Sequence, residues 1–366
     1  MKKATLRPYV WGICFLLLIL DAKTALAGAA EGTDLCLHAL IPSLFPFFVL
    51  SILLTSSLAG QKIRLLAPLT GVLGMQPGTE ALLLIGLLGG YPVGAQTVAQ
   101  AYEAGTLSKQ EAERMLGFCN NAGPAFLFGI VSGKFASVSA TWVLWGIHIL
   151  SALITAMLLP RAMIGRETLI ERKKVTVNQA LQRAIRVMAT VCGWVVLFRV
   201  MIAFCSKWLY PFLPVAMQVL LTGSLEMANG CLALGAIMPA GVRFVVAAAI
   251  LSAGGLCVAM QTLSVTGKLG SGMYFPGKVL QTAISIVLAS VFQRFLFSRE
   301  QTMENVLIPI IISAFLAAAT LLWLKKTVAF PKKMLYNHKN GTQEANLCSF
   351  ASESKRTAAT ASTARH

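Results

Sequence analysis

The chain has 366 residues, of which 56% are hydrophobic and only 12% are charged, and its formal net charge is +17. Since soluble globular proteins carry about 25% charged residues, this composition excludes an ordinary soluble domain and predicts an all-α polytopic membrane protein. The basic residues gather at the two ends and in one central segment, which is the pattern of cytoplasmic flanks, so the charge does not indicate a nucleic-acid partner.

Residues 1–30 are predicted to form an N-terminal membrane helix, because the apolar run 10–20 follows three basic residues and meets Asp21 and Lys23 only near its end. The sequence ALAG at 25–28 also fits a signal-peptidase site. The sequence therefore leaves two alternatives open, an uncleaved first span and a cleaved signal peptide.

Residues 31–160 are predicted to form the first of two repeats. Its first apolar run, 35–58, contains two prolines four residues apart, which kink a spanning helix without ending it when neighbouring helices satisfy the backbone. The next apolar segment, 81–101, is interrupted by GGYP at 89–92, where glycine and proline remove helix propensity and one backbone donor. We expect the helix to break there.

The rest of the first repeat contains one more break and one ordinary span. Ser108 lies three residues before Glu111, the spacing of a capping box, so a short surface helix should start there. Segment 118–130 is again interrupted by small residues and a proline, whereas 142–159 is a continuous apolar span. Broken backbone at membrane depth is tolerated only where protein or a water-filled cavity satisfies it, so both breaks point to a binding site.

A basic cytoplasmic linker is predicted at 161–186, and the second repeat at 187–325. The apolar segments of the second repeat are 187–204, 212–237, 242–263, 279–297 and 306–324. The tail, 326–366, is basic and has no apolar period, so we expect it to be disordered and cytoplasmic and to attract anionic lipid.

The basic character of both ends and of the linker predicts how the two halves enter the membrane. If all three segments are cytoplasmic, each half crosses an even number of times, although each contains five apolar segments. At least one segment per half then fails to span, and the broken segments are the candidates. The halves enter from opposite sides and form inverted repeats, a plan typical of secondary transporters.

The breaks of the two halves occur in the same order. GLLGGYPVGAQTV at 86–98 corresponds to LTGSLEMANGCLAL at 221–234, and GFCNNAGPAFLFG at 117–129 corresponds to ILSAGGLCVAMQ at 250–261. Half-helix ends at such breaks present unpaired N–H groups and a positive dipole end, which suit an anion.

Several of these motifs also carry a family resemblance, which extends from about residue 30 to residue 297. They are GGYPVGAQ, SKQEAER, FCNNAGPAF, IPSLFPFFVLS, LTGSLEMANG, SAGGLCVAMQ and FPGKVLQ. The chain resembles sporulation integral membrane proteins with a Gate (nucleoside-recognition) domain, a group that includes a forespore dipicolinate transporter. The resemblance implies two inverted Gate-like repeats with broken or re-entrant helices and about 8–10 membrane segments.

The resemblance further implies a secondary-type transporter of a small anionic ring solute, with dipicolinate as the leading substrate, in a membrane around the forespore of a spore former. The wider group is similar to concentrative nucleoside carriers and to the membrane part of ferrous-iron transporters. A nucleoside or other small-solute carrier therefore stays open as an alternative, and so does a non-transporting sporulation membrane scaffold.

Candidate substrate-binding residues lie at the predicted breaks. They are Gly90, Tyr91, Pro92, Gly94, Gln96, Asn120, Asn121, Pro124, Ser252, Gly254, Gly255 and Gln261. Tyr91 can stack on a ring ligand, and the side-chain amides of Asn120 and Asn121 are costly in an apolar segment unless they are partnered. The alternatives are that Tyr91 packs, that the Asn pair holds helices together, and that the glycines only permit close backbone approach.

Glu226 is the candidate for ion or proton coupling, because an intramembrane carboxylate is expensive and is commonly a proton or cation site. The alternative is that Glu226 caps a helix at the break. His148 has no ligand-spaced partner and is expected to be packed and hydrogen-bonded. No enzyme motif or metal-ligand spacing is present in the sequence, so we expect no catalytic site, metal or cofactor. The expected partners are a small-molecule anion and membrane lipid, and a homo-oligomer is left open.

Overall fold

The computed structural model describes residues 7–58, 61, 63–135, 137–161, 175–235, 238–297 and 310–325. Within these residues every regular element is helical. The described helices that are long and apolar enough to cross a membrane are Ala22–Leu54, Val138–Leu158, Val177–Trp208, Ala240–Thr266 and Tyr274–Leu296. Shorter apolar helices lie at Trp11–Leu20, Val215–Leu225 and Ile310–Lys325. The predicted all-α polytopic membrane class is confirmed.

The N-terminal region differs from the two separate spans that the sequence predicted. Helix α1 (Arg7–Leu20) ends before Asp21, whose carboxylate accepts from the Thr24 N–H at 3.4 Å and caps α2 (Ala22–Leu35). Helix α2 then continues through the π-helical turn η1 (Cys36–Leu40) into α3 (Ile41–Leu58). The predicted boundary between residues 30 and 31 therefore lies inside a continuous helix.

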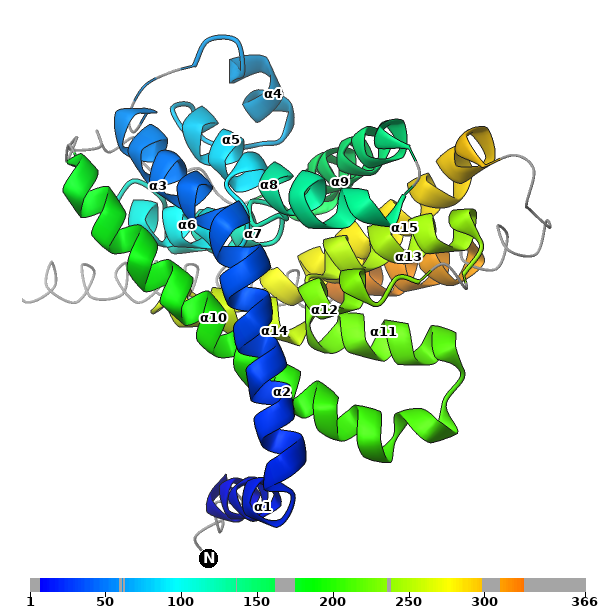
Figure 1. Ribbon diagram of the computed structural model, residues 1–366. Coiled ribbons are helices and arrows are strands. Elements are labelled where there is room, and N and C mark those ends of the chain that lie inside the picture. The colour runs from blue at the N-terminus through cyan, green and yellow to red at the C-terminus, as the bar shows by residue number, and fades with distance from the viewer. Residues whose placement is uncertain are drawn as a thin grey trace, which may run out of the picture. The chain divides into compact units, whose positions relative to one another are not determined.

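Two glycines allow α2 to pack closely against another helix. A Cβ added to Gly28 would lie 2.9 Å from the Val200 Cα atom, and one added to Gly32 would lie 2.9 Å from the Val196 Cα atom. Gly28 and Gly32 are four residues apart, so they form one face on which the partner helix approaches closely. This contact joins α2 to α10 (Val177–Trp208), as Figure 1 shows.

The predicted boundary between the linker and the second repeat also differs from the structure, because α10 begins ten residues before the predicted start of the span at 187. Thr176 and Gln179 form a reciprocal capping box at its N-terminus. Ala180, Ala184 and Val187 are buried at helical spacing, so packing extends the helix into residues that the charge count had assigned to a loop. Residues 162–174 of the predicted linker lie outside the described residues.

The first half contains several short helices and one longer helix, and two of its interruptions lie where the sequence predicted breaks. The elements are α4 (Ala67–Val72), α5 (Glu80–Leu88), α6 (Val93–Glu103), α7 (Lys109–Leu116), α8 (Pro124–Phe126), the turns η2 (Leu127–Val131) and η3 (Ser132–Lys134), and α9 (Val138–Leu158). Gly90 has φ +80° between α5 and α6, a conformation that glycine adopts without a Cβ penalty. The capping box of Ser108 and Glu111 is confirmed at the start of α7.

The second half has breaks of the same kind. Its elements are η4 (Tyr210–Phe212), α11 (Val215–Leu225), α12 (Met227–Leu232), α13 (Ala240–Ala253), α14 (Gly255–Thr266) and α15 (Tyr274–Leu296). One predicted span breaks at Glu226, between α11 and α12, and the next breaks at Gly254, which has φ +73° between α13 and α14.

The chain divides into two compact units, Met1–Ala318 and Ala319–His366, and the structure describes residues 319–325 of the second. In the first unit α10 packs against α2 and α3, and α15 packs against both α9 and α13 (Figure 1). Helix α6 contacts α14. The two predicted repeats therefore interleave, and their breaks meet in one buried region. The predicted tail at 326–366 lies outside the described residues.

Candidate functional site

A buried lysine lies where the breaks of the two halves meet. Lys278, on α15, is only 4% exposed. Its Nζ atom donates to the Tyr91 hydroxyl at 3.2 Å, the Asn120 carbonyl at 2.5 Å and the Gln281 Oε1 atom at 2.9 Å. None of the ion pairs within the described part of the chain involves Lys278. The ammonium group is thus satisfied by neutral oxygen atoms.

Tyr91, between α5 and α6, is already engaged on its ring face and at its hydroxyl. The Lys278 Nζ atom lies 5.0 Å from the ring centroid, within the range of a cation–π contact. The hydroxyl donates to the Leu251 carbonyl at 3.1 Å, and a Cβ added to Gly254 would lie 3.4 Å from the ring. In this conformation Tyr91 packs between the two halves, and its stacking on a ligand remains a prediction.

Asn120 connects the loop before α8 to two other helices. Its Nδ2 atom donates to the Thr262 Oγ1 atom of α14 at 2.8 Å, and its Oδ1 atom accepts from the Ala95 N–H of α6 at 3.3 Å. Since its backbone carbonyl accepts from Lys278, this one residue joins the first half to α14 and α15.

Asn121 is paired in the same way. Its Nδ2 atom donates to the Gly86 carbonyl at 3.0 Å and the Phe118 carbonyl at 2.7 Å, and its Oδ1 atom accepts from the Gln281 Nε2 atom at 2.7 Å. Both asparagines are fully buried. The pair therefore holds helices together in this conformation, which is one of the two roles that the sequence left open.

His148, on α9, completes the buried network. Its Nε2 atom accepts from the Ala122 N–H at 3.1 Å, which leaves the ring proton on Nδ1, 3.3 Å from the Ser252 Oγ atom. The Gln281 Nε2 atom also lies 3.5 Å from the His148 carbonyl. The expectation of a packed, hydrogen-bonded histidine is confirmed. Ser252, a predicted site residue, belongs to this network.

The small residues at the breaks let backbone segments approach closely. A Cβ on Gly94 would collide with the Cys119 carbonyl oxygen, and a Cβ on Gly123 would lie 3.0 Å from the Gly90 Cα atom. A Cβ on Gly255 would lie 2.8 Å from the Gly223 carbonyl oxygen. The glycines thus fit the structural role of close approach that the sequence left open.

Three other predicted residues make no side-chain hydrogen bond to the Lys278 network within the described part of the chain. Pro124 occupies the first turn of α8, and the Gln261 Nε2 atom is paired with the Cys257 Sγ atom of its own helix at 3.2 Å. Gln96 lines a cavity on the other face of α6. Hydrogen bonds among the described residues therefore connect only part of the predicted set.

Glu226 is buried and caps α12. Its carboxylate accepts from the Ala228 N–H at 3.0 Å, the Asn229 N–H at 2.6 Å and the Asn229 Nδ2 atom at 2.7 Å. This is the capping arrangement that the sequence left open, and three donors of its own helix surround the carboxylate. A role of Glu226 in coupling remains a prediction.

Sequence reasoning had assigned no role to two central members of the network, Lys278 and Gln281. They lie three residues apart in FPGKVLQ and therefore share a face of α15. The available signal was Lys278 itself, because a basic residue inside an apolar span marks a functional site by default. In the sequence, this motif contributes only to the family resemblance.

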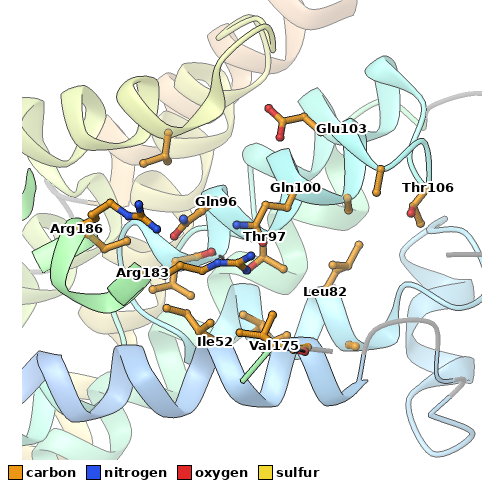
Figure 2. Close-up of a pocket in the computed structure, with 18 of the residues that line it drawn as sticks. Ile52, Leu82, Gln96, Thr97, Gln100, Glu103, Thr106, Val175, Arg183 and Arg186 are labelled. Atoms are coloured by element: carbon orange, nitrogen blue, oxygen red, sulfur yellow. Dashed lines mark hydrogen bonds between the residues drawn. The ribbon is translucent and has the colours of Figure 1, made fainter. Parts of the chain in front are cut away.

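A cavity of about 740 Å³ lies beside α6, between α3, α5 and α10. Its polar lining includes Gln96, Thr97, Gln100, Arg183, Arg186 and Thr190. Figure 2 shows the guanidinium groups of Arg183 and Arg186 extending from α10 toward the amides of α6. Ligand pockets commonly measure about 300–1,000 Å³, so this cavity has room for a small solute.

These features define the protein as a polytopic all-α membrane protein with interrupted helices in both halves. It is similar to the sporulation integral membrane protein YlbJ of Bacillus subtilis (strain 168), with 28% identity over 171 residues. The match covers 46% of this chain and 42% of that protein. No family model and no solved structure matches the chain. The resemblance stated from the motifs is supported at the level of a sporulation membrane protein.

Proposed function

We propose that the protein is a secondary-type membrane transporter of a small anionic solute. The observation that carries this proposal is Lys278, a buried cation without a carboxylate partner among the described residues, held where interrupted helices of both halves meet. Burying a charge is costly, and the ends of half-helices at membrane depth are typical of transporter binding sites.

An anion can compete for Lys278 because the present acceptors are neutral. A carboxylate adds the attraction between opposite charges, which the neutral acceptors lack and which is strong in a buried, low-dielectric site. A solute carboxylate would therefore replace an acceptor such as the Tyr91 hydroxyl or Gln281. Releasing these bonds would loosen the contact between the halves, and movement of two inverted repeats against each other would then expose the site to alternate sides.

By resemblance, the leading substrate is dipicolinate, moved during spore formation across a membrane around the forespore. Its two carboxylates and aromatic ring match a cation and Tyr91. Glu226 remains our proposal for the proton or cation site that compensates the charge of the solute. Three donors of α12 surround its carboxylate, which reduces the repulsion between that carboxylate and a bound anion.

The direct test is uptake of labelled dipicolinate into proteoliposomes, beside a labelled nucleoside. We expect saturable dipicolinate uptake by the wild type, loss of uptake in Lys278→Met and Asn121→Ala, and full uptake in the control Lys268→Met, which removes an exposed lysine. Nucleoside uptake instead would retain the carrier and replace the substrate. Absence of both, in protein with an intact melting transition, would overturn transport.

The second candidate is a non-transporting sporulation membrane scaffold. The observation that favours it is the complete pairing of the Asn120 and Asn121 amides, which is what a purely structural network requires. A scaffold predicts that Lys278→Met changes stability or assembly without any uptake to lose, so the same experiment separates the two functions.

A further inference from the structure

A second pair of cations lies outside the Lys278 network, in the cavity of about 740 Å³ beside α6. Arg183 and Arg186 are three residues apart on α10 and therefore share a helix face. Their guanidinium groups extend toward Gln96, Thr97 and Gln100 on α6 (Figure 2). The cavity thus places two positive groups opposite two side-chain amides from a different helix.

These groups have no protein partners within the described part of the chain. No ion pair there involves Arg183 or Arg186, and no hydrogen bond there involves their guanidinium groups or the amides of Gln96 and Gln100. Glu103 is the acidic residue among the described lining residues, and it is exposed on the last turn of α6. Two unpaired cations that share one cavity repel each other, and a bound anion removes this repulsion.

We propose that this cavity binds an oxyanion, a carboxylate or phosphate group, through Arg183 and Arg186. A guanidinium offers a planar fork of donors that matches both groups. The amides of Gln96 and Gln100 supply further donors from the opposite side. Snorkelling of two arginines at the end of a span does not account for these amides, which a second helix directs into the same space.

The apolar part of the lining, which includes Ile52, Val93 and Val187, suits the rest of such a ligand. Two sources offer this chemistry. One is a soluble aromatic dicarboxylate, in which case the inference rests on the proposed transport function and names a second binding position for the solute. The other is the phosphate of an anionic phospholipid, for which basic pockets between membrane helices are suited.

The test measures equilibrium binding of probes to the full-length protein, purified in a neutral detergent, by titration calorimetry. The probes are pyridine-2,6-dicarboxylate, inorganic phosphate and short-chain phosphatidylglycerol, with short-chain phosphatidylcholine as the uncharged control. We expect the Arg183→Gln/Arg186→Gln double variant to weaken binding at least about tenfold and Gln96→Ala to weaken it severalfold. The control double variant Lys23→Gln/Lys268→Gln removes two exposed charges outside the cavity and should bind like the wild type.

Each outcome decides the proposal. Loss of dicarboxylate binding in the arginine variants supports the soluble source, and loss of phosphatidylglycerol binding alone supports the lipid source. Equal binding by the wild type and the arginine variants, or no binding of any probe, would overturn the site. If the double variant does not fold, the single variant Arg186→Gln, at an exposed position, carries the test.

The site and the carrier can fail separately. Arginine-dependent binding of the dicarboxylate without uptake by wild-type proteoliposomes would retain the site and overturn transport. Normal uptake by the Arg183→Gln/Arg186→Gln variant, together with unchanged binding, would retain the carrier and overturn the site.

Discussion

The network around Lys278 and the cavity beside α6 both contain cations without carboxylate partners among the described residues, but they satisfy them differently. The ammonium of Lys278 is buried and donates to three oxygen atoms of the protein. Arg183 is partly buried and Arg186 is exposed, and within the described residues no acceptor bonds to their guanidinium groups. Hydrogen-bond donors that are paired within the protein hold helices in place, whereas unpaired donors that face a cavity can bind a ligand.

The largest expected effect belongs to the buried cation. Lys278→Met should reduce solute uptake by about 100-fold or more, because it removes a desolvated, hydrogen-bonded charge. Its melting temperature should change little, since losing the desolvation cost of the ammonium offsets the lost hydrogen bonds. Uptake assays and thermal unfolding check this pair of outcomes, with Lys268→Met as the control. A lowered melting temperature together with normal uptake would contradict this prediction.

Two amide truncations compare the network and the cavity directly. Asn121→Ala should lower the free energy of unfolding by about 2–3 kcal/mol, because it removes three hydrogen bonds of the buried network, to Gln281 and to two backbone carbonyls. Gln96→Ala should change this free energy by less than about 0.5 kcal/mol, because its side-chain amide makes no hydrogen bond among the described residues. Denaturant unfolding in detergent measures both changes in free energy. Equal losses in the two variants would contradict the proposed difference between the network and the cavity.

Salt should separate the two regions as well. Raising the ionic strength from about 0.05 to about 0.5 M should weaken anion binding in the cavity severalfold, because partly exposed charges are screened. The melting temperature, to which the buried network contributes, should shift far less. Binding titrations and melting curves recorded in the same buffers test this. Salt-independent binding would place the anion away from Arg183 and Arg186.

A small effect on stability is expected at Glu226. Glu226→Gln keeps one oxygen acceptor for the α12 N-terminus, so the free energy of unfolding should fall by only about 0.5–1 kcal/mol. Glu226→Ala, which removes the cap, should cost more. If Glu226→Gln also abolishes uptake while the protein stays folded, the coupling role is retained, whereas normal uptake leaves the residue a cap alone.

Local features were predicted well because their causes are local. Hydropathy and charge indicated the membrane class, and glycine with proline indicated the break between α5 and α6. The capping box at Ser108 was readable from spacing alone. The predicted start of the span at 187 was wrong. The charges suggested a loop where α10 continues, because Ala180 and Ala184 are buried.

Only part of the candidate site could be predicted from the sequence. Tyr91, Asn120 and Asn121 were named from the sequence, yet their partners lie far along the chain: Lys278 is 187 residues from Tyr91. Gln96 was assigned to the same site, although it faces a separate cavity with arginines that had been counted as part of a linker. Neither grouping follows from spacing, because both depend on which helices pack together.

By itself the sequence determined that this is an α-helical membrane protein whose spans are interrupted in both halves, because hydropathy, glycine and proline act over a few residues. Only the tertiary structure decided that Lys278 fills the meeting point of these breaks. It also decided that two arginines share a cavity with Gln96. The reason is that hydrogen-bond partners in a buried network are selected by long-range packing, which local sequence does not encode.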